Sequence, residues 1–182
     1  MKTIILIVGE SCSGKDFLSQ ILEGKDGYKV LKSYATRPKR IGEGNTHVFI
    51  KPEEVKNYKN DFVAYTKIGE YEYFSTKQQL LDSDIYIIDP NGVEYLKSKV
   101  NDINIKIVVI YINVSEEDRY IRAKNIRKDN ENEIEKRFKA ERNQFNKFKL
   151  NGDFDYSVSN RNVMKAYKII KYIIEIETGG SE

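Results

Sequence analysis

The sequence predicts an α/β fold in which a parallel β-sheet is covered by helices on both faces. Several short runs of the chain are continuously apolar and rich in β-branched residues, which is typical of strands buried on both faces. Segments whose apolar residues recur with a helical period follow these runs. Because strands that alternate with helices form parallel sheets wrapped by their connections, the pattern indicates this class of fold.

The expected elements follow from these patterns in chain order. The runs "TIILIV", "DIYIID", "IKIVVIYI" and "DYSVS" place strands at residues 3–8, 84–89, 105–112 and 155–159. Helical periods place helices at residues 15–22, 92–100, 115–127, 131–148 and 162–177. The first helix is expected to bury one face, formed by Phe17, Leu18, Ile21 and Leu22. The tail "TGGSE" is expected to be frayed.

Residues 33–80 interrupt the alternation of strands and helices. They are polar, tyrosine-rich and irregular, as expected of a subdomain inserted into the main fold. The remaining core would consist of residues 1–32 and 81–182. Since 182 residues suffice for one substantial hydrophobic core, the sequence predicts a single domain over residues 1–182.

Composition excludes several classes of function. The longest apolar stretches are too short to cross a bilayer, and the start of the chain lacks the pattern of an export signal, so we expect a cytoplasmic protein without membrane contact. One cysteine and one histidine cannot form a Cys/His zinc site. A net charge of +3 slightly favours anionic small molecules and does not indicate nucleic acid binding. No obligate protein partner is indicated.

The most informative motif is "GESCSGK", residues 9–15, which has the spacing G-x4-G-K between a buried strand and a helix. Glycines let the backbone curl so that successive amide groups can point at phosphate oxygens, and the helix N-terminus adds partial positive charge. A lysine at this place bridges the terminal phosphates. The motif therefore predicts a phosphate-binding loop, and with the alternating strands it predicts a P-loop NTPase fold.

Asp16 departs from the usual form of this loop, in which a hydroxyl at this position coordinates magnesium. A carboxylate is also a magnesium ligand and binds the ion directly or through water. An acid in the first turn of a helix is in addition favourable to the helix dipole. The sequence thus predicts a magnesium contact at Asp16 and leaves the dipole as an alternative reason for the residue.

A second anion site is predicted in "SYATRPKRIGEG", residues 33–44. Arg37 and Arg40 flank a rigid proline, and two guanidinium groups at this spacing can clamp one phosphate. A solvated basic loop is the alternative. A phosphate loop alone shows only that a nucleoside triphosphate is held, so the acceptor of any phosphoryl group would be bound at this second site.

These motifs resemble the guanylate kinase family of nucleoside monophosphate kinases over nearly the whole chain. The blocks "GESCSGKD", "SYATRPKRIGEG", "GEYEYFST" and "IIDPNG" occur in the family's order, followed by "EIEKRF" and "FDYSVSN". The resemblance implies transfer of the ATP γ-phosphoryl group to GMP or dGMP, with magnesium as cofactor. It also implies a core, a monophosphate-binding subdomain at residues 33–80 and a lid at about residues 119–138.

The resemblance also assigns roles to individual residues. Those implied to contact ATP are Gly9, Glu10, Ser11, Cys12, Ser13, Gly14, Lys15, Asp16 and Asn160. Those implied to contact the acceptor are Ser33, Arg37, Arg40, His47, Tyr73, Ser75 and Asp89. Those implied to act in catalysis are Lys15, Arg37 and the lid residues Arg122, Arg127 and Arg137. Most other charges of the lid segment are expected on a solvated helix face.

Several positions depart from the family pattern. Ala64 stands where the family has a glutamate that binds the guanine edge, and Glu72 is a candidate substitute. His47 replaces a phosphate-binding tyrosine, and Phe74 replaces a glycine. Losing a base-edge carboxylate weakens discrimination between bases, so these changes bear on the choice of acceptor.

Two other functions are therefore alternatives to that of a guanylate kinase. Ribose bisphosphate phosphokinases are similar to guanylate kinases and can carry G-K-D in the loop, so Asp16, Ala64 and His47 favour that acceptor or another monophosphate. Guanylate-kinase-like binding modules are catalytically silent but have degraded loops. Here Lys15 and both loop glycines are present, which favours an enzyme.

Overall fold

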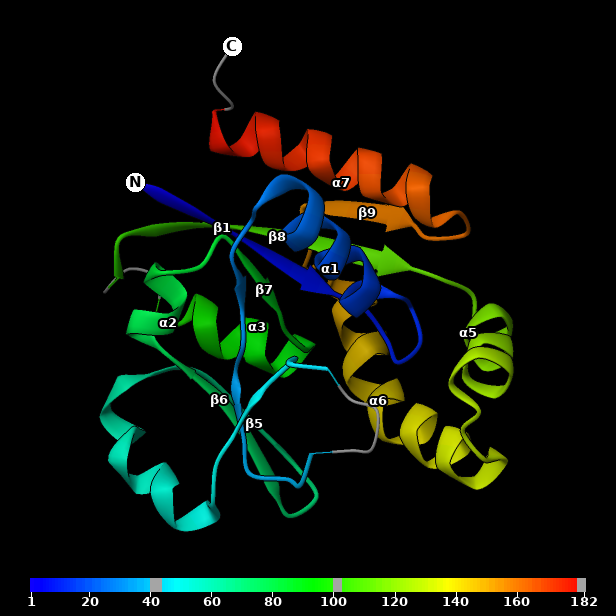
Figure 1. Ribbon diagram of the computed structural model, residues 1–182, viewed down its shortest axis with the longest axis horizontal. Coiled ribbons are helices and arrows are strands. Elements are labelled where there is room, and N and C mark those ends of the chain that lie inside the picture. The colour runs from blue at the N-terminus through cyan, green and yellow to red at the C-terminus, as the bar shows by residue number, and fades with distance from the viewer. Residues whose placement is uncertain (40–43, 100–102, 180–182) are drawn as a thin grey trace.

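The structure, a computed structural model, describes residues 1–39, 44–99 and 103–179. Its main sheet is parallel throughout and has the strand order β2-β7-β1-β8-β9 (Figure 1). The strands are β1 (Lys2–Val8), β2 (Val30–Leu31), β7 (Ile85–Ile87), β8 (Ile105–Asn113) and β9 (Tyr156–Ser159). The predicted α/β fold with a parallel sheet is confirmed.

Helices cover both faces of this sheet because β1 buries side chains on both sides. Ile4, Leu6 and Val8 face one apolar cluster, which includes residues of α3 (Pro90–Lys97) and α6 (Glu131–Asn151). The alternate residues of β1 face a second cluster, formed with α1 (Lys15–Asp26) and α7 (Val163–Thr178) (Figure 1). Burial on both faces explains why the strand is a continuous apolar run.

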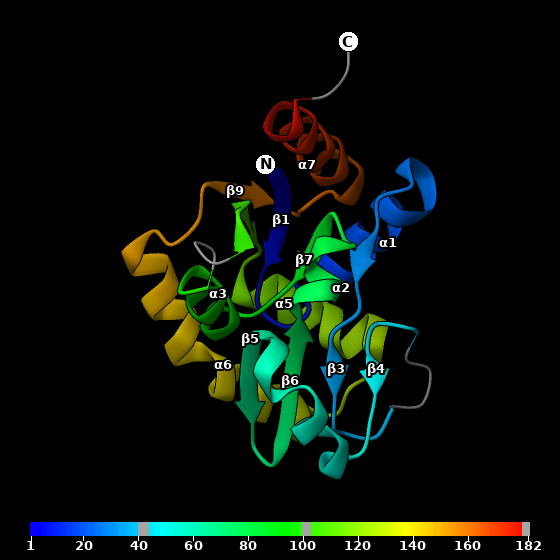
Figure 2. The ribbon, with the colours of Figure 1, turned by 90° about the vertical axis from the view of Figure 1, so that its left-hand side faces the viewer.

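A second, four-stranded sheet lies beside the main one and is built from the segment that breaks the alternation (Figure 2). Its order is β4-β3-β6-β5, with β3 and β4 parallel and the other pairs antiparallel. The strands are β3 (Tyr34–Ala35), β4 (Val48–Phe49), β5 (Phe62–Ile68) and β6 (Tyr71–Thr76). The short helices η1 (Pro52–Asn57) and η2 (Lys59–Asp61) precede β5, and α2 (Lys77–Leu81) leads back to the main sheet.

The predicted helix at residues 115–127 has two parts. α5 (Glu116–Arg122) is α-helical and begins at Ser115, whose hydroxyl accepts a hydrogen bond from the Asp118 amide at 3.1 Å. η3 (Ala123–Arg127) is a π-helical turn that ends at Lys128, where φ is +57°. A wider turn of this kind has no distinct period in a short sequence, so the pattern did not predict it.

Three other expectations differ from the structure or lie outside it. Phe17 lies in the first turn of α1 and is 55% exposed, because the buried face of that helix is centred on Leu18 and Leu22. α3 ends at Lys97, and residue 100 of the predicted helix is outside the described residues. The same holds for the last three residues of the tail, 180–182. In the described part of the chain, no helix combines the length and apolarity needed to span a membrane.

Candidate active site

The glycine loop joins the end of β1, at the centre of the main sheet, to the start of α1. Its curl depends on two left-handed residues, Cys12 with φ +63° and Gly14 with φ +88°. The amide of Ser13 donates to the carbonyl of Glu10 at 3.1 Å and closes the turn. The predicted loop therefore occupies the place that its motif requires, with the N-terminus of α1 directed at the same region.

Gly14 cannot be replaced without strain and a clash. A Cβ atom there would lie 2.5 Å from Nδ2 of Asn160, whereas a Cβ at Gly27, which has φ +74°, would meet nothing within 4 Å. We expect Gly27→Ala to lower the free energy of unfolding by about 1–2 kcal/mol, the cost of a left-handed non-glycine residue. Gly14→Ala should lower it further and also weaken ATP binding, as measured by denaturant unfolding and calorimetric titration. Equal effects of the two variants would contradict this assignment.

Lys15 and Asp16 begin α1 and lie at the mouth of the loop. The Lys15 side chain is 19% exposed and that of Asp16 is 56% exposed, with 4.0 Å between Nζ and Oδ2. The carboxylate of Asp16 is therefore open to solvent beside the lysine. In this position it can contact a cation that the phosphates of a bound nucleotide also hold.

Glu10, in contrast, turns its side chain away from the loop. One carboxylate oxygen accepts a hydrogen bond from the Tyr111 hydroxyl at 2.8 Å, and the other pairs with Lys149 at 3.1 Å. The residue is buried. Of the loop residues implied to contact ATP, Glu10 thus offers its backbone to the loop while its side chain joins the loop to β8 and α6.

Arg122 and Asn160 support the loop at the carbonyl of Ser13. Nδ2 of Asn160 donates to this oxygen at 2.8 Å, and Arg122 donates to it at 3.1 Å. Arg122 also donates to the Asn160 carbonyl. The Oδ1 atom of Asn160 is buried and has no hydrogen-bond partner among the described residues. The structure thus brings both predicted residues to the loop, with Arg122 engaged by backbone oxygens.

The other two arginines of the predicted lid share one acid. Arg137 donates to Oδ2 of Asp129 at 3.0 Å, and Nε of Arg127 lies 3.4 Å from the same oxygen. A terminal nitrogen of Arg127 is 3.7 Å from Sγ of Cys12 in the glycine loop. The segment that carries these arginines therefore lies against the phosphate loop.

The predicted acceptor residues gather on the second sheet. Arg37 is buried, donates from Nε to the Tyr73 hydroxyl at 3.1 Å and lies 5.2 Å from the centre of the Phe49 ring. The Ser33 hydroxyl and Nδ1 of His47 are 2.9 Å apart, and the His47 ring is 5.7 Å from that of Tyr73. Four of the predicted residues thus form one cluster. Arg40, predicted as the second clamp residue, lies outside the described residues.

Asp89 is bound to the second sheet through Thr66 and lies within electrostatic reach of Lys15. It caps α3, and its Oδ1 accepts hydrogen bonds at 2.9 Å from the Gly92 amide and from the Thr66 hydroxyl of β5. Its Oδ2 is buried without a partner among the described residues. Burial raises the pKa of Asp89, although the two hydrogen bonds and the nearby charge of Lys15 oppose this shift.

The raised pKa predicts a specific dependence of stability on pH. Above the ordinary value of 3.8, the folded protein holds the Asp89 proton more tightly than the unfolded chain, so stability falls as pH rises through the folded pKa. Asp89→Asn keeps an acceptor oxygen for Thr66 and Gly92 and removes the charge. We therefore expect a higher free energy of unfolding than wild type at pH 7, and no gain below pH 3.8.

Asp26 serves as the matched control for this measurement. Burial raises its pKa, but hydrogen bonds from Lys171 and Tyr167 and the charge of Lys171 outweigh burial, so the pKa is lowered. Asp26→Asn should therefore destabilise the protein at neutral pH. Chemical unfolding between pH 3 and pH 8 compares the two variants, and the same sign for both would contradict the assigned cause.

The faces of the second sheet decide which carboxylate can reach the acceptor region. Tyr73 pairs with Thr66 in the ladder between β5 and β6, so the two side chains lie on the same face of the sheet. This is the face to which Asp89 binds, through its hydrogen bond from Thr66. Glu72 is the next residue and points to the opposite face, where it accepts a hydrogen bond from Tyr65 at 2.8 Å. The expectation that Glu72 substitutes for the missing carboxylate is not supported by this placement.

Ala64 and Ser75 pair on the same face as Tyr73. Both are buried, and Ala64 belongs to the apolar cluster below α3 and α6. The Ser75 residue is fully buried. Asp89 is thus a carboxylate that binds the face of the second sheet on which Tyr73 lies.

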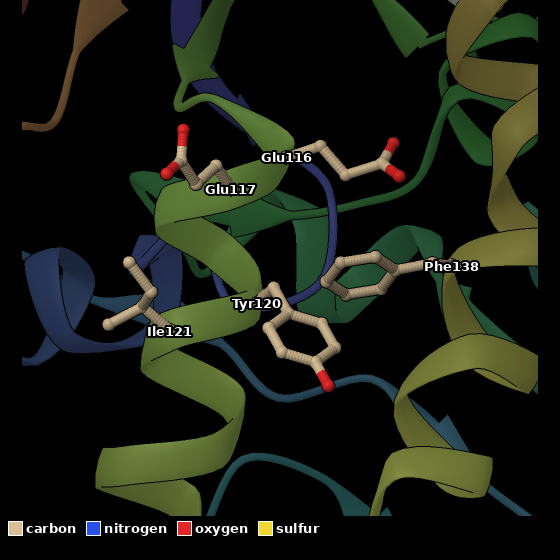
Figure 3. Close-up of a pocket in the computed structure, with 5 residues that line it drawn as sticks. All are labelled: Glu116, Glu117, Tyr120, Ile121 and Phe138. Atoms are coloured by element: carbon tan, nitrogen blue, oxygen red, sulfur yellow. The ribbon is translucent and has the colours of Figure 1, made fainter.

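A shallow hollow of about 500 Å³ lies elsewhere, between α5 and α6 (Figure 3). It is lined by Glu116, Glu117, Tyr120, Ile121 and Phe138. None of these residues belongs to the glycine loop or the second sheet. Tyr120 and Phe138 nevertheless share an apolar cluster with Cys12 of the glycine loop, so the hollow borders the loop on the side of α5 and α6.

Three contributors to the site were not predicted from the sequence. Thr66 orients Asp89, and Arg119 and Glu141 hold the backbone of Ser11. Thr66 lies in an ordinary strand pattern, and the other two are charged residues of helical segments. Their roles depend on contacts between distant parts of the chain, for which local patterns carry no signal.

The parallel sheet and the glycine loop between β1 and α1 define a P-loop NTPase fold. A sequence model of the guanylate kinase family matches residues 1–177, and the chain belongs to the guanylate kinase family. Membership makes it an ATP-dependent nucleoside monophosphate kinase that acts on small nucleotide substrates. The family predicted from the sequence motifs is thereby confirmed.

A solved structure supports the fold independently. The guanylate kinase from Anaplasma phagocytophilum is 18% identical in sequence and superposes with a TM-score of 0.69, over 97% of this chain and 86% of that chain. A comparison with curated protein sequences finds no match. At this low identity the structural likeness concerns the fold, and the assignment to the family depends on the sequence model.

Proposed function

We propose that this protein transfers the γ-phosphoryl group of ATP to GMP or dGMP, which yields ADP and GDP or dGDP. One observation supports the proposal: a series of interactions connects residues of the two predicted anion sites. The charge of Lys15 acts on Asp89, Asp89 binds Thr66, and Thr66 pairs with Tyr73, which accepts a hydrogen bond from Arg37. We therefore infer that both sites face one region.

On the donor side, the loop amides and Lys15 would bind the ATP phosphates. Magnesium fits this site, because the ion usually keeps several waters and takes one or two carboxylates together with substrate phosphates. Asp16 supplies such a carboxylate, and no group of three or more acidic, histidine or cysteine side chains in the described ranges forms a closed metal cage. When bound, the ion would neutralise charge on the transferred group.

On the acceptor side, residues 33–80 would form the monophosphate-binding subdomain, with Arg37, Arg40, His47 and Tyr73 around the phosphate. The segment from about 119 to 138 would act as a lid that brings Arg127 and Arg137 to the transferred group. Phosphoryl transfer needs alignment and positive charge more than covalent help from the protein. The acceptor phosphate is its own nucleophile, so no general base is required.

A second acceptor class is favoured by a specific observation. Ala64 provides no carboxylate for a guanine edge, and Glu72 lies on the opposite face of the sheet. A site without a base-edge carboxylate discriminates poorly between bases. Ribose 1,5-bisphosphate, or a monophosphate with another base, is therefore the alternative acceptor. The intact loop, with Lys15 and both glycines, argues against a silent binding module.

A panel of acceptors tests the proposal. Purified protein with ATP and magnesium is offered GMP, dGMP, AMP, CMP, UMP, dTMP and ribose 1,5-bisphosphate, and ADP formation is followed. Highest kcat/KM with GMP or dGMP supports the proposal, and highest kcat/KM with ribose 1,5-bisphosphate establishes the alternative. Absence of ADP formation with every acceptor would contradict phosphoryl transfer. The cytoplasm is the proposed location, since these nucleotides are available there.

A further inference from the structure

Ser11 in the glycine loop is held by a pair of charged residues from two helices. Its amide donates to both oxygens of the Glu141 carboxylate, at 3.1 and 2.9 Å, and its hydroxyl donates to one of them at 2.9 Å. Arg119 donates to the Ser11 carbonyl at 3.3 Å and to Glu141 at 3.1 Å. Three polar groups of one loop residue are thus bound by side chains of α5 and α6.

The pair is shielded from water. The side chains of Arg119 and Glu141 are 6% and 13% exposed. The guanidinium lies 4.5 Å from the centre of the Phe138 ring, which projects from α6 toward Tyr120 of α5 (Figure 3). Charge-assisted hydrogen bonds are stronger where water is excluded, so these contacts have more weight than an ion pair on the surface.

The position of Ser11 explains why such contacts matter for the loop. The next residue, Cys12, has φ +63°, a conformation that non-glycine residues rarely adopt. Backbone of this kind persists when the surroundings fix it on several sides. Because the amide and carbonyl of Ser11 are both bound, the orientation of the peptide groups leading into Cys12 is fixed. The curl that presents the following amides is thereby fixed as well.

The same two residues connect the loop to the lid. Glu141 follows Arg137 by four residues on α6, so the two side chains lie one above the other on one face of the helix. On α5, Arg119 precedes Arg122, which binds the carbonyl of Ser13. The helices that carry these arginines, α5 and α6, therefore contact the loop through hydrogen bonds to Ser11 and Ser13.

We propose that Arg119 and Glu141 are positioning residues, which fix the shape of the phosphate loop and the place of α6 relative to it. The pair touches no substrate in this role and acts through Ser11. The inference deepens the proposed function, since it assumes that the loop binds ATP. It predicts that loss of the pair weakens binding of the donor and leaves binding of the acceptor unchanged.

The test compares Glu141→Ala, Glu141→Gln and Arg119→Met with wild type. Affinity for a non-hydrolysable ATP analogue and for the acceptor chosen by the panel is measured by calorimetry, together with kcat. We expect Glu141→Ala to bind the ATP analogue about tenfold or more weakly and to lower kcat, because small misplacements of positioned groups can cost about 10²-fold. Acceptor affinity should stay within about twofold.

Glu141→Gln retains an oxygen for Ser11 but not the charge that pairs with Arg119, so its ATP affinity should lie between wild type and Glu141→Ala. If Glu141→Ala does not fold, the glutamine variant decides the question. Arg142→Gln is the matched control, because Arg142 joins the same two helices through Glu116 at 3.0 Å on the exposed surface. It should leave ATP affinity unchanged.

Two results would overturn the inference: ATP affinity equal to wild type in a folded Glu141→Ala or Glu141→Gln variant, or an equal loss of ATP and acceptor affinity. Wild-type protein that binds no ATP analogue would instead contradict the proposed function. The double variant Arg119→Met with Glu141→Ala should bind ATP no more weakly than the worse single variant, since the two residues act as a unit.

Discussion

Lys15→Met is expected to lower kcat for phosphoryl transfer by about 10²- to 10³-fold, while the protein stays folded. The ammonium group of Lys15 is the positive side chain at the mouth of the glycine loop, where charge develops on the transferred group. Methionine has a similar length and keeps the apolar part of the side chain. The loss should therefore appear in kcat and in ATP affinity and leave the thermal midpoint close to that of wild type.

Lys25→Met is the control for this variant. Lys25 lies in the last turn of the same helix, α1, where its ammonium group is 5.8 Å from the centre of the Tyr167 ring. The substitution removes the same charge far from the loop and should leave kcat within about twofold of wild type. Comparable kcat values for Lys15→Met and wild type, in a coupled assay of ADP, would show that the loop lysine has no part in the reaction.

The second large effect is expected at Arg37. Arg37→Lys should raise the KM for the acceptor by about ten- to a hundredfold, the cost of losing charge-assisted hydrogen bonds. Lysine keeps the positive charge but lacks the planar fork that binds a phosphate with two parallel bonds, and it also loses the contact with Tyr73. Because Arg37 follows β3 and contacts the second sheet through Tyr73, affinity for ATP should be unchanged.

Lys39→Gln separates the role of Arg37 from that of positive charge in its surroundings. Lys39 is exposed, and its ammonium group donates to the Asn45 side chain at 3.3 Å. Removing this charge should alter the acceptor KM by less than about threefold. If Arg37→Lys weakened ATP binding as much as acceptor binding, the division into donor and acceptor sites would be wrong.

The main sheet could be predicted from the sequence because each of its long strands is buried on both faces. The strand expected at residues 3–8 is observed as Lys2–Val8, and the run at 105–112 as Ile105–Asn113. The glycine loop could be predicted equally well, since its motif, the strand before it and the helix after it are contiguous in the chain. Local sequence determines such features, and they can be inferred without knowledge of distant contacts.

The second sheet illustrates what the sequence could not show. β3 and β4 have two residues each, which is too short for a periodic pattern. The ladder between β5 and β6 shifts its register between Phe62 and Ala64, and this register decides which face each side chain occupies. From the sequence, Glu72 was therefore a candidate to bind the acceptor base. Its pairing with Lys67 places its side chain on the face of the sheet opposite to that of Tyr73.

The role of Arg119 is another feature that the sequence could not show. Most charges of the predicted lid segment were expected on a solvated face, and most are exposed, but Arg119 is buried against Phe138 and bound to Glu141, 22 residues further along the chain. A buried charge becomes favourable only when a partner and further hydrogen bonds accompany it. The partners of Arg119 come from α6 and from the glycine loop, so only the packed structure identifies them.

Binding of a dinucleoside pentaphosphate, in which adenosine is linked to the acceptor nucleoside, tests directly whether the two phosphate sites share one cleft. Such a ligand can fill both sites only if they face each other at the distance of a phosphate chain, and linkage then makes its affinity exceed that of either nucleotide alone. Calorimetry should show one molecule bound per chain, with loss of both ATP and acceptor binding. A complex that still binds the acceptor with unchanged affinity would contradict the shared cleft.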